Sequence, residues 1–306
     1  MTHRGKYPAK LMLVGEYGVV IGGSALTIPF RAFHARVRSV EEIPDGKEQE
    51  ARQSLGHLEQ LFRYIQGLPA GAFHASPDLQ RFSENLQNYW MDLDIPIGFG
   101  LGSSGAISAA IYDLFFPEAK GLSLQHQKED LATIESYFHG KSSGVDALTC
   151  HAASALRFHS SGHIERVTFN PAEIPGGYRF FLLNSQERFD TGPLVNHFLD
   201  RMKEEAYRRA MEEEYLSLNQ LLIESLLGEK EADPAMLVRL ISDFQLQHFP
   251  KMIPENMVEL WIEGLVSNAY YLKLNGSGGG FMLGVAHGSF RESLDERWGK
   301  HLLWIE

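Results

Sequence analysis

The chain has 306 residues, of which 44% are hydrophobic and 22% are charged. This composition is typical of a globular protein, and the length suffices for two domains or for one large two-layer unit. The formal net charge of -11 argues against a surface that binds nucleic acid or anionic membranes, because such surfaces depend on clustered Lys and Arg. An anionic ligand would therefore be held by a local site.

The single cysteine, Cys150, excludes an intrachain disulfide, and we expect it to be a small buried residue. Arg4 and Lys6 precede a fairly apolar stretch over residues 11–23, which imitates a secretory signal. Glu16 interrupts that stretch, and no apolar run approaches the roughly 18 residues of a membrane helix. We therefore expect no signal, no membrane segment and a cytoplasmic location.

The first half of the chain is predicted to mix short strands with helices. A buried strand is expected over residues 11–14, a turn at 16–18, an apolar segment over 19–21 and a second strand over 32–40. Apolar residues at helical spacing predict helices over 50–65, 79–89, 104–116 and 123–139, and a short one over 147–153. Pro117 ends the third of these helices.

The second half begins with strands and continues with helices. Strands are expected over 157–158, 165–169 and 178–183, followed by a long helical stretch over 194–227, helices over 234–249 and 256–267, and strands over 270–274 and 281–285. This order predicts an α+β protein with two sheets. We place the two domains at residues 1–170 and 171–306.

A run of glycines followed by two serines is the most informative motif. It consists of Gly98, Phe99, Gly100, Leu101, Gly102, Ser103, Ser104 and Gly105, and it leads into the predicted helix over 104–116. Glycines can turn backbone N–H groups toward an anion, and the start of a helix adds further donors, so the run is typical of a phosphate cradle. A tight connection is the alternative. The run lacks the Lys of a Walker loop and the spacing of a dinucleotide fingerprint.

Three charged residues elsewhere complete a site for phosphoryl transfer. Such a reaction needs a carboxylate to accept the hydroxyl proton, an oxygen ligand for magnesium and a cation for the developing charge. Asp146, Glu135 and Lys10 supply these roles in that order. Each has a plain alternative: Lys10 as a solvated strand end, Glu135 as a solvated helix residue and Asp146 as a helix cap.

A second glycine run, at residues 276–280, separates the last two strands. A flexible hairpin is the simple explanation, although five small residues exceed what a hairpin requires. The histidines, among them His3, His34, His57, His126 and His151, are predicted to be structural, because we find no metal-ligand spacing among them.

In this order the motifs resemble the GHMP kinase superfamily, which includes galactokinases, homoserine kinases, mevalonate kinases and phosphomevalonate kinases. Residues 9–17, 96–106 and 274–280 resemble its three motifs, and residues 135–146 resemble the mevalonate kinases in particular. The resemblance implies a ribosomal-protein-S5-like N-terminal domain, a ferredoxin-like C-terminal domain and ATP-dependent phosphorylation of a small-molecule hydroxyl, most simply that of mevalonate in isoprenoid biosynthesis.

The resemblance also implies roles for individual residues. Asp146 is the base that Lys10 assists, Glu135 with Ser103 or Ser104 binds Mg2+, and residues 98–105 bind ATP. Residues implied on the substrate side are Glu16, Tyr17, His139, Ser143, Gly144, Arg188, Thr191, Gly276, Ser277 and Gly278. Arg188 suits a substrate carboxylate, because its guanidinium is forked. The partners implied are ATP and a small hydroxylated molecule, with the chain a monomer or a homodimer.

Two departures leave the acceptor open. Tyr17 stands where mevalonate kinases usually have His, and Tyr is more familiar there in phosphomevalonate kinases. Asn275 stands where Thr is usual in the third motif, which also has one glycine fewer. A phosphomevalonate kinase, a sugar kinase and a silent nucleotide or metabolite sensor on the same fold remain alternatives.

Overall fold

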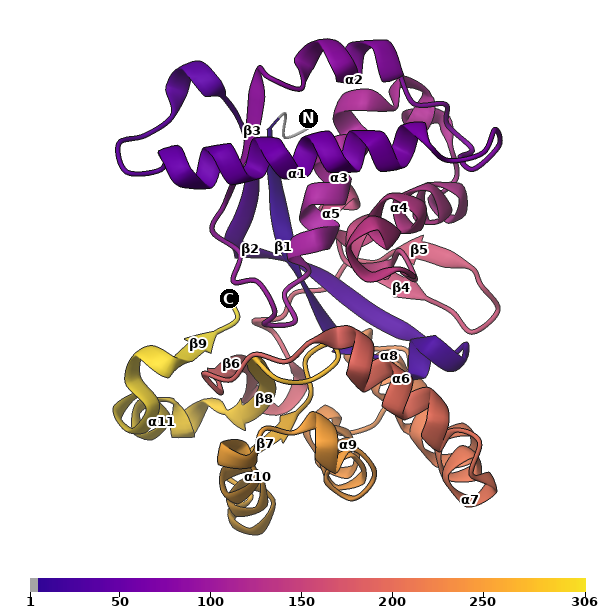
Figure 1. Cartoon of the computed structure of the whole chain (residues 1–306). Helices are drawn as coiled ribbons and strands as arrows, with labels where there is room; N and C mark the ends of the chain where they lie inside the picture. Colours follow the sequence, from indigo (N-terminus) through magenta and orange to yellow (C-terminus); the bar gives the residue numbers. More distant parts are fainter. Residues whose placement is uncertain (1–4) are drawn as a thin grey trace. The chain divides into compact units, whose positions relative to one another are not determined.

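The computed structural model describes residues 5–306, apart from the side chain of His139. Two of the residues considered above, His3 and Arg4, lie outside the described residues. Helices and strands are mixed along the chain, and the strands form two sheets (Figure 1). The predicted α+β class is confirmed.

The α-helices of the described residues are α1 (Glu48–Gln66), α2 (Leu79–Asn85), α3 (Ser103–Phe115), α4 (Leu124–His139), α5 (Val145–Ala152), α6 (Thr191–Arg201), α7 (Glu205–Arg209), α8 (Leu216–Leu226), α9 (Pro234–His248), α10 (Glu255–Ser267) and α11 (Arg291–Trp298). The strands are β1 (Lys6–Val14), β2 (Ala25–Ser39), β3 (Tyr89–Leu93), β4 (Leu156–Phe158), β5 (Ile164–Arg166), β6 (Tyr178–Asn184), β7 (Tyr270–Lys273), β8 (Phe281–His287) and β9 (Leu302–Trp304).

The strands form two sheets. The first has the order β1-β2-β4-β5, with β3 also paired to β2, and the second has the order β7-β8-β6-β9. In the first sheet β2 runs antiparallel to both β3 and β4, with Val37 opposite Met91 and Leu26 opposite Arg157. All three pairs of the second sheet are antiparallel.

The chain divides into two compact units, each made of several segments. The first unit comprises the described residues up to Lys10, Ile28–Ile97 and Leu101–Ser154. The second comprises Leu11–Thr27, Gly98–Gly100 and Ala155–Glu306. The predicted division at residues 170 and 171 concerns contiguous domains, and it stays a prediction.

In the first unit, helices pack on one another and on the strands. α1 places its buried residues, Ala51, Leu58, Leu61 and Ile65, on one face and packs against β3. Their spacing of three, four and seven residues is that of an amphipathic helix. α3, α4 and α5 pack pairwise, and they carry Ser103 and Ser104, Glu135 and Asp146 respectively.

In the second unit, helices cover the four-stranded sheet. α9 packs against β7 and β8, α10 packs against β7, and α8 packs on α9. Aromatic side chains dominate this core: the ring of Tyr215 stacks on Phe244 at 4.8 Å and meets Phe249 edge-on at 5.3 Å. Large buried rings contribute the largest share of apolar burial in such a layer.

Several elements differ from the prediction. β3, which was not predicted, begins at Tyr89, where a helix was expected to end. The helix α2 stops earlier, at Asn85, and Tyr89 pairs with Ser39 of β2. The expected helical stretch over 194–227 is interrupted between α6 and α7 and has π-helical geometry over Ala210–Tyr215. β1 begins at Lys6, so Lys10 lies inside the strand rather than at its start, and α11 and β9 were not predicted.

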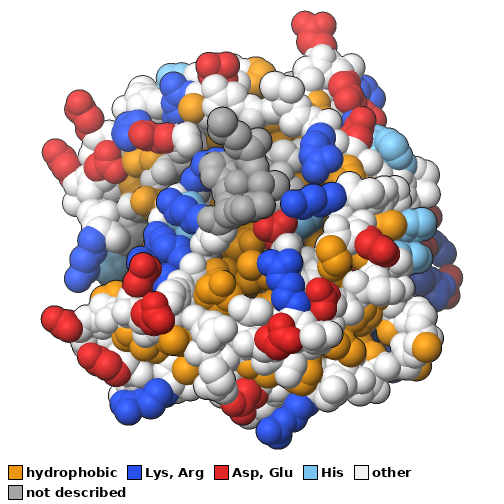
Figure 2. Space-filling model, turned by 90° about the horizontal axis from the view of Figure 1, so that it is seen from above, with side chains coloured by type: hydrophobic (Ala, Val, Ile, Leu, Met, Phe, Trp, Pro, Cys, Tyr) orange, Lys and Arg blue, Asp and Glu red, His pale blue; other side chains and the backbone are white. Residues whose placement is uncertain are grey.

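The surface agrees with a chain that carries both signs of charge. On the face in Figure 2, acidic and basic side chains both appear among uncharged ones. Within residues 5–306, no helix combines the length and the apolar composition that crossing a membrane requires. Cys150 is buried, as predicted.

Candidate active site

The first unit contains an ion pair between Lys10 and Asp146. Lys10 Nζ is 2.8 Å from Asp146 Oδ2, and the lysine side chain is 2% exposed whereas the aspartate is 31% exposed. The backbone N–H of Lys10 donates to the carbonyl of Leu101 at 3.0 Å, which fixes the strand beside the end of the glycine run. The lysine is thus enclosed, and the carboxylate is the member of the pair that an incoming molecule can reach.

The position of Asp146 depends on close packing of α3 against α5. Asp146 lies in the first turn of α5, after Gly144 at the N-cap. A Cβ on Gly105 of α3 would lie 2.9 Å from the carbonyl carbon of Asp146 and from the backbone nitrogen of Ala147. Only glycine allows the two helices to approach so closely, which explains the glycine that follows Ser104.

Glu135 is buried in α4 and is held by two serine hydroxyls. Ser104 Oγ donates to its Oε1 at 2.9 Å, and Ser142 Oγ donates to its Oε2 at 2.5 Å. Burial, followed by the negative charge of Asp146, raises the pKa of Glu135 from 4.5 to about 7, although both serines and Lys10 oppose the shift. The cluster therefore holds two neighbouring carboxylates against one lysine.

This donor set fits a magnesium ion. Mg2+ prefers hard oxygen ligands such as carboxylates, and it usually keeps several waters and takes few protein ligands. Glu135 and Ser104 offer a carboxylate and a hydroxyl oxygen that already contact each other. A cation would also offset the repulsion between Glu135 and Asp146, which favours binding there.

The glycine run changes backbone direction before α3. Gly98, Gly100 and Gly102 have φ values of +82°, +75° and +70°, a region that L side chains rarely adopt. Ser103 and Ser104 then form the first turn of α3, whose N–H groups have no partner within the helix. Gly98–Gly100 belong to the second unit, and Leu101 onward to the first.

In the second unit, Glu16 forms a buried ion pair with Lys273 of β7. Neither side chain is more than 1% exposed, and Lys273 Nζ also donates to the carbonyl of Leu274 at 2.9 Å. The Tyr215 hydroxyl donates to the backbone carbonyl of Glu16 at 3.1 Å. A contact between Glu16 and a substrate stays a prediction, whereas the pair with Lys273 is an observed structural contact.

Tyr17 connects the first motif to the second glycine run. Its φ of +59° is uncommon for a residue other than glycine, and its ring packs against Phe198 and Phe249 at 4.9 and 5.1 Å. Its hydroxyl donates to the carbonyl of Ser277 at 2.6 Å, and burial raises the pKa of Tyr17. Ser277 Oγ in turn lies 3.0 Å from Thr191 Oγ1.

The second unit thus brings together several of the predicted substrate residues. Tyr17, Thr191 and Ser277 form one hydrogen-bonded group. Arg188 is exposed, and its side chain lies against Gly98, where an added Cβ would be 2.5 Å from Nε. Gly276 faces Gly100, while Gly278 lies against the backbone of Met252.

Other predicted residues belong to the first unit. Ser143 Oγ accepts a hydrogen bond from the backbone N–H of Val145 at 3.4 Å, so this serine helps to begin α5. Gly144 provides the turn in front of that helix. His139 is the last residue of α4, and its side chain lies outside what the structure describes.

Sequence reasoning missed three residues that the structure places in these groups. Ser142 contacts Glu135, and Lys273 contacts Glu16. Asn275, noted only as a departure from the third motif, is buried and donates from Nδ2 to the carbonyl of Gly100 at 3.4 Å. Lys273 had a signal in the sequence, since a lysine in an otherwise apolar strand requires an acidic partner.

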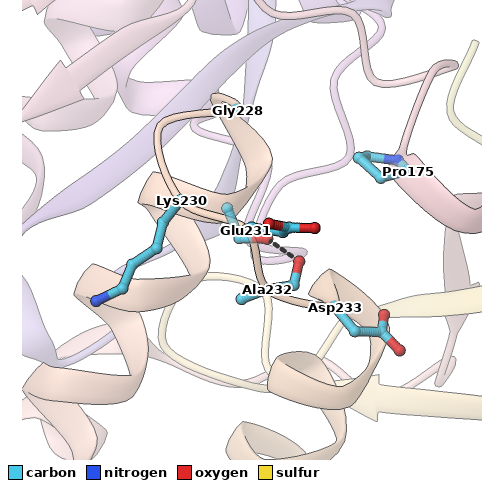
Figure 3. A pocket seen from close by; sticks show the side chains of 7 residues that line it. Pro175, Gly228, Lys230, Glu231, Ala232 and Asp233 are labelled. Atoms are coloured by element: carbon cyan, nitrogen blue, oxygen red, sulfur yellow. Dashed lines mark hydrogen bonds between the residues drawn. The ribbon is translucent and has the colours of Figure 1, made fainter.

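The second unit also has a pocket, which is lined by residues outside the sequence motifs (Figure 3). It has a volume of about 580 Å³ and is lined by Pro175, Ser225, Gly228, Lys230, Glu231, Ala232 and Asp233. Ser225 Oγ donates to the carbonyl of Ala232 at 2.6 Å and so shapes the loop between α8 and α9. Its lining includes none of the predicted site residues.

Residues 73–153 match the family described as GHMP kinases N terminal domain. A curated mevalonate kinase from Pyrococcus furiosus is 29% identical over 189 residues, which is 56% of this chain and 55% of that protein. The match therefore spans about half the length of that relative. The family segment includes the serines of the glycine run, Glu135 and Asp146.

Solved structures extend the similarity over nearly the whole chain. The structure of L. major mevalonate kinase in complex with R-mevalonate has a TM-score of 0.64 at 15% identity and covers 99% of this chain and 95% of that chain. The structure of Streptococcus pneumoniae phosphomevalonate kinase in complex with phosphomevalonate and AMPPNP has a TM-score of 0.61 at 16% identity, with 98% and 99% covered.

The fold is that of the GHMP kinases, and the resemblance predicted from the three motifs is confirmed. The chain is similar in sequence to a mevalonate kinase and in fold to mevalonate kinases.

Proposed function

We propose that this protein is a kinase that transfers the γ-phosphoryl group of ATP to the hydroxyl of a small molecule. The observation that carries the proposal is the cluster of Lys10, Asp146, Glu135 and Ser104 in one compact unit. Three of these residues lie in the segment that matches the GHMP kinases. A binding protein without catalysis has no need for a reachable carboxylate paired with a buried lysine.

In the proposed reaction, Asp146 accepts the proton of the acceptor hydroxyl. The hydroxyl oxygen forms a bond to the γ-phosphorus, the bond from that phosphorus to the β,γ-bridging oxygen breaks, and ADP leaves. Lys10 holds Asp146 in place at 2.8 Å and places a positive charge beside the group that reacts. The N–H groups of residues 103–105 at the start of α3 are suited to phosphate oxygens.

Glu135 and Ser104 would hold Mg2+. The bound ion would neutralise charge on the phosphates, and the serine that contacts Glu135 in the structure is Ser104 rather than Ser103. Glu135 is kept in position by Ser104 and Ser142 together.

Mevalonate is the acceptor that we propose. The relatives support it, since the Pyrococcus furiosus protein is a mevalonate kinase and the L. major structure contains R-mevalonate. Arg188 would pair with the carboxylate, because the residue is exposed and its forked guanidinium suits such a group. Phosphomevalonate is the second candidate, favoured by Tyr17 and by the fold of the Streptococcus pneumoniae enzyme.

A panel of acceptors tests the function. ATP consumption is measured with mevalonate, phosphomevalonate, homoserine and galactose, and we expect mevalonate to give the highest kcat/KM. If phosphomevalonate or a sugar gives it instead, the acceptor assignment is wrong and the kinase assignment stands. ATP binding without turnover of any of the four would favour a sensor.

The role of Asp146 is tested by Asp146→Asn, which keeps the shape of the side chain but removes the base. We expect kcat to fall by roughly 10²- to 10⁴-fold, as is typical for the loss of a general base. ATP affinity, measured by calorimetry, should change little, because the glycine run and α3 are intact. Unchanged turnover would exclude Asp146 as the proton acceptor.

A further inference from the structure

A second group of potential metal ligands lies on the surface of the first unit, apart from the residues of the proposed reaction. It consists of His74, from the connection between α1 and α2, and of His126 and Glu129 from α4. Their ligand atoms all lie within 4.8 Å of one another. All three side chains are exposed, so a metal ion can reach them from solvent. The histidines were predicted to be structural because no metal-ligand spacing was found among them. His74 lies 52 positions from His126 in the sequence, and the fold brings the two together.

The backbone of His74 is held in place by a buried carboxylate. Asp130, which is fully buried, accepts a hydrogen bond from the N–H of His74 at 2.6 Å and another from the N–H of Ala75 at 3.0 Å. The Tyr112 hydroxyl donates to the same carboxylate at 2.8 Å. Since Asp130 follows Glu129 in α4, this contact fixes the distance between His74 and the two ligands on the helix.

The geometry of α4 brings the other two ligands close together. His126 and Glu129 are three residues apart, so both project from the same face of α4. Gln125 Nε2 donates to Glu129 Oε1 at 2.6 Å and leaves Oε2 facing His74 Nε2 at 2.7 Å. Hydrogen bonds of this kind orient a metal ligand from outside its coordination sphere.

The ligand chemistry selects the class of metal. Two imidazoles and one carboxylate are typical ligands of Zn2+ and neighbouring transition metals, whereas Mg2+ prefers oxygen alone. The rings of His74 and His126 are stacked, with centroids 4.1 Å apart and planes at 12°. Both are exposed, and a rotation of the rings would aim one nitrogen of each at a common ion. Water would complete the coordination.

A second cluster of two histidines and a glutamate, in the second unit, is less suited to bind a metal ion. His159, His163 and Glu165 also lie within reach of one another. However, Arg157 Nη1 is 3.8 Å from Glu165 Oε1, and its fixed positive charge would repel a cation. No charged amine or guanidinium is paired with Glu129 among the described ion pairs.

We propose that His74, His126 and Glu129 bind one divalent transition metal ion of the zinc class. The bound ion cross-links the connection over residues 67–78 to α4. The bound ion replaces the hydrogen bond between His74 and Glu129 by two metal bonds and adds His126 to the contact. Because the native state alone presents the three ligands together, binding stabilises the first unit.

The test is calorimetric titration of the full chain, free of any histidine tag and of nucleotide, with Zn2+. Co2+ is used in parallel, because its visible absorption reports the coordination number and geometry of the bound ion. We expect one equivalent to bind to the unaltered protein and to raise its unfolding temperature. The variants are His74→Ala, His126→Ala and Glu129→Gln, each of which changes an exposed side chain and should still fold.

We expect each of the three variants to lose this equivalent. Gln125→Ala should keep it with affinity reduced about tenfold, as is usual when an orienting partner is removed. His163→Ala and Glu135→Gln serve as controls that remove the second cluster and the proposed magnesium ligand, and both should bind as the unaltered protein does. The proposal is overturned if the unaltered protein binds no Zn2+, if the three variants bind it equally well, or if a control variant loses the equivalent.

Discussion

At the scale of single residues, the buried pair of Glu16 and Lys273 explains how the first motif is joined to β7. Both side chains are enclosed, so each charge depends on the other for compensation. Taking two charges out of water is costly, and such a pair need not stabilise a protein relative to apolar residues of the same volume. Removing one member alone is strongly destabilising, because it leaves an uncompensated buried charge.

We therefore expect Glu16→Gln and Lys273→Met each to lower the free energy of unfolding by about 3–5 kcal/mol. The double variant should lose much less than the sum of the two, since it leaves no charge behind. Urea unfolding of the three variants measures the difference. Additive losses would show that the two side chains act independently and that the contact has little energetic weight.

The pKa of Glu135 also predicts how stability depends on pH. Burial and the neighbouring Asp146 raise it from 4.5 to about 7 in the folded chain. Between these values the folded state binds more protons than the unfolded state, so stability falls as the pH rises. The loss is complete above the folded pKa and amounts to roughly 3 kcal/mol for a shift of this size.

Glu135→Gln removes this titration and keeps the shape of the side chain. In buffer without divalent ions, we expect the variant to be more stable than the unaltered protein at about pH 8 and close to it at about pH 5. Thermal unfolding across this range measures the difference. Curves that stay parallel at all pH values would exclude a raised pKa at Glu135.

At the scale of elements, the contact between α3 and α5 decides where Asp146 lies. The contact is possible because Gly105 has no Cβ, and an added methyl group would meet the backbone at 2.9 Å. Gly105→Ala should push α5 away and shift Asp146 from Lys10. We expect a loss of stability of about 1–3 kcal/mol, typical of overpacking, and a larger relative loss of kcat.

Gly56→Ala is the matched control. Gly56 lies inside α1, and an added Cβ there would have nothing within 4 Å. This substitution should stabilise the chain by about 0.5–1 kcal/mol, because alanine is the better helix former. Chemical denaturation and steady-state kinetics of both variants give the comparison. Equal effects of the two substitutions would mean that the contact between α3 and α5 is loose.

The elements also show what the sequence can predict. α3, α4, α9 and α10 were predicted nearly to their ends, because their apolar residues follow the helical period and a cap or proline marks a boundary. β3 was missed because Tyr89–Leu93 has no alternating pattern and becomes a strand only by pairing with β2. α11 has few apolar residues, so its helix depends on packing against neighbouring segments.

At the scale of the whole molecule, the charged residues of the candidate site could be predicted from the sequence, but the residues that contact them could not. Lys10, Glu135 and Asp146 could be chosen from chemistry and motif order, and the structure brings the three together in one unit. The contacts of Ser142, Lys273 and Asn275 were not predicted, because their partners lie far away in the sequence or because a loop turns back on a helix. Contacts of this kind become visible only once the chain is folded.

The two compact units are discontinuous, and this bears on the predicted division at residues 170 and 171. The second unit includes Leu11–Thr27 as well as the C-terminal half. Within it, Glu16 pairs with Lys273, and the Tyr17 ring packs on Phe198 and Phe249. A fragment of residues 171–306 lacks Leu11–Thr27 and would retain Lys273 without its acidic partner.

We therefore expect the fragment of residues 171–306 not to fold cooperatively by itself. Burying Lys273 without Glu16 costs several kcal/mol, which is comparable to the whole stability of a domain. Far-UV circular dichroism and thermal melts of the fragment measure this, with the full chain as reference. The same fragment with Lys273→Met should regain part of its structure, because the unpaired charge is gone. A cooperative melt of the unaltered fragment would instead support the predicted contiguous domain and show that Leu11–Thr27 is dispensable for it.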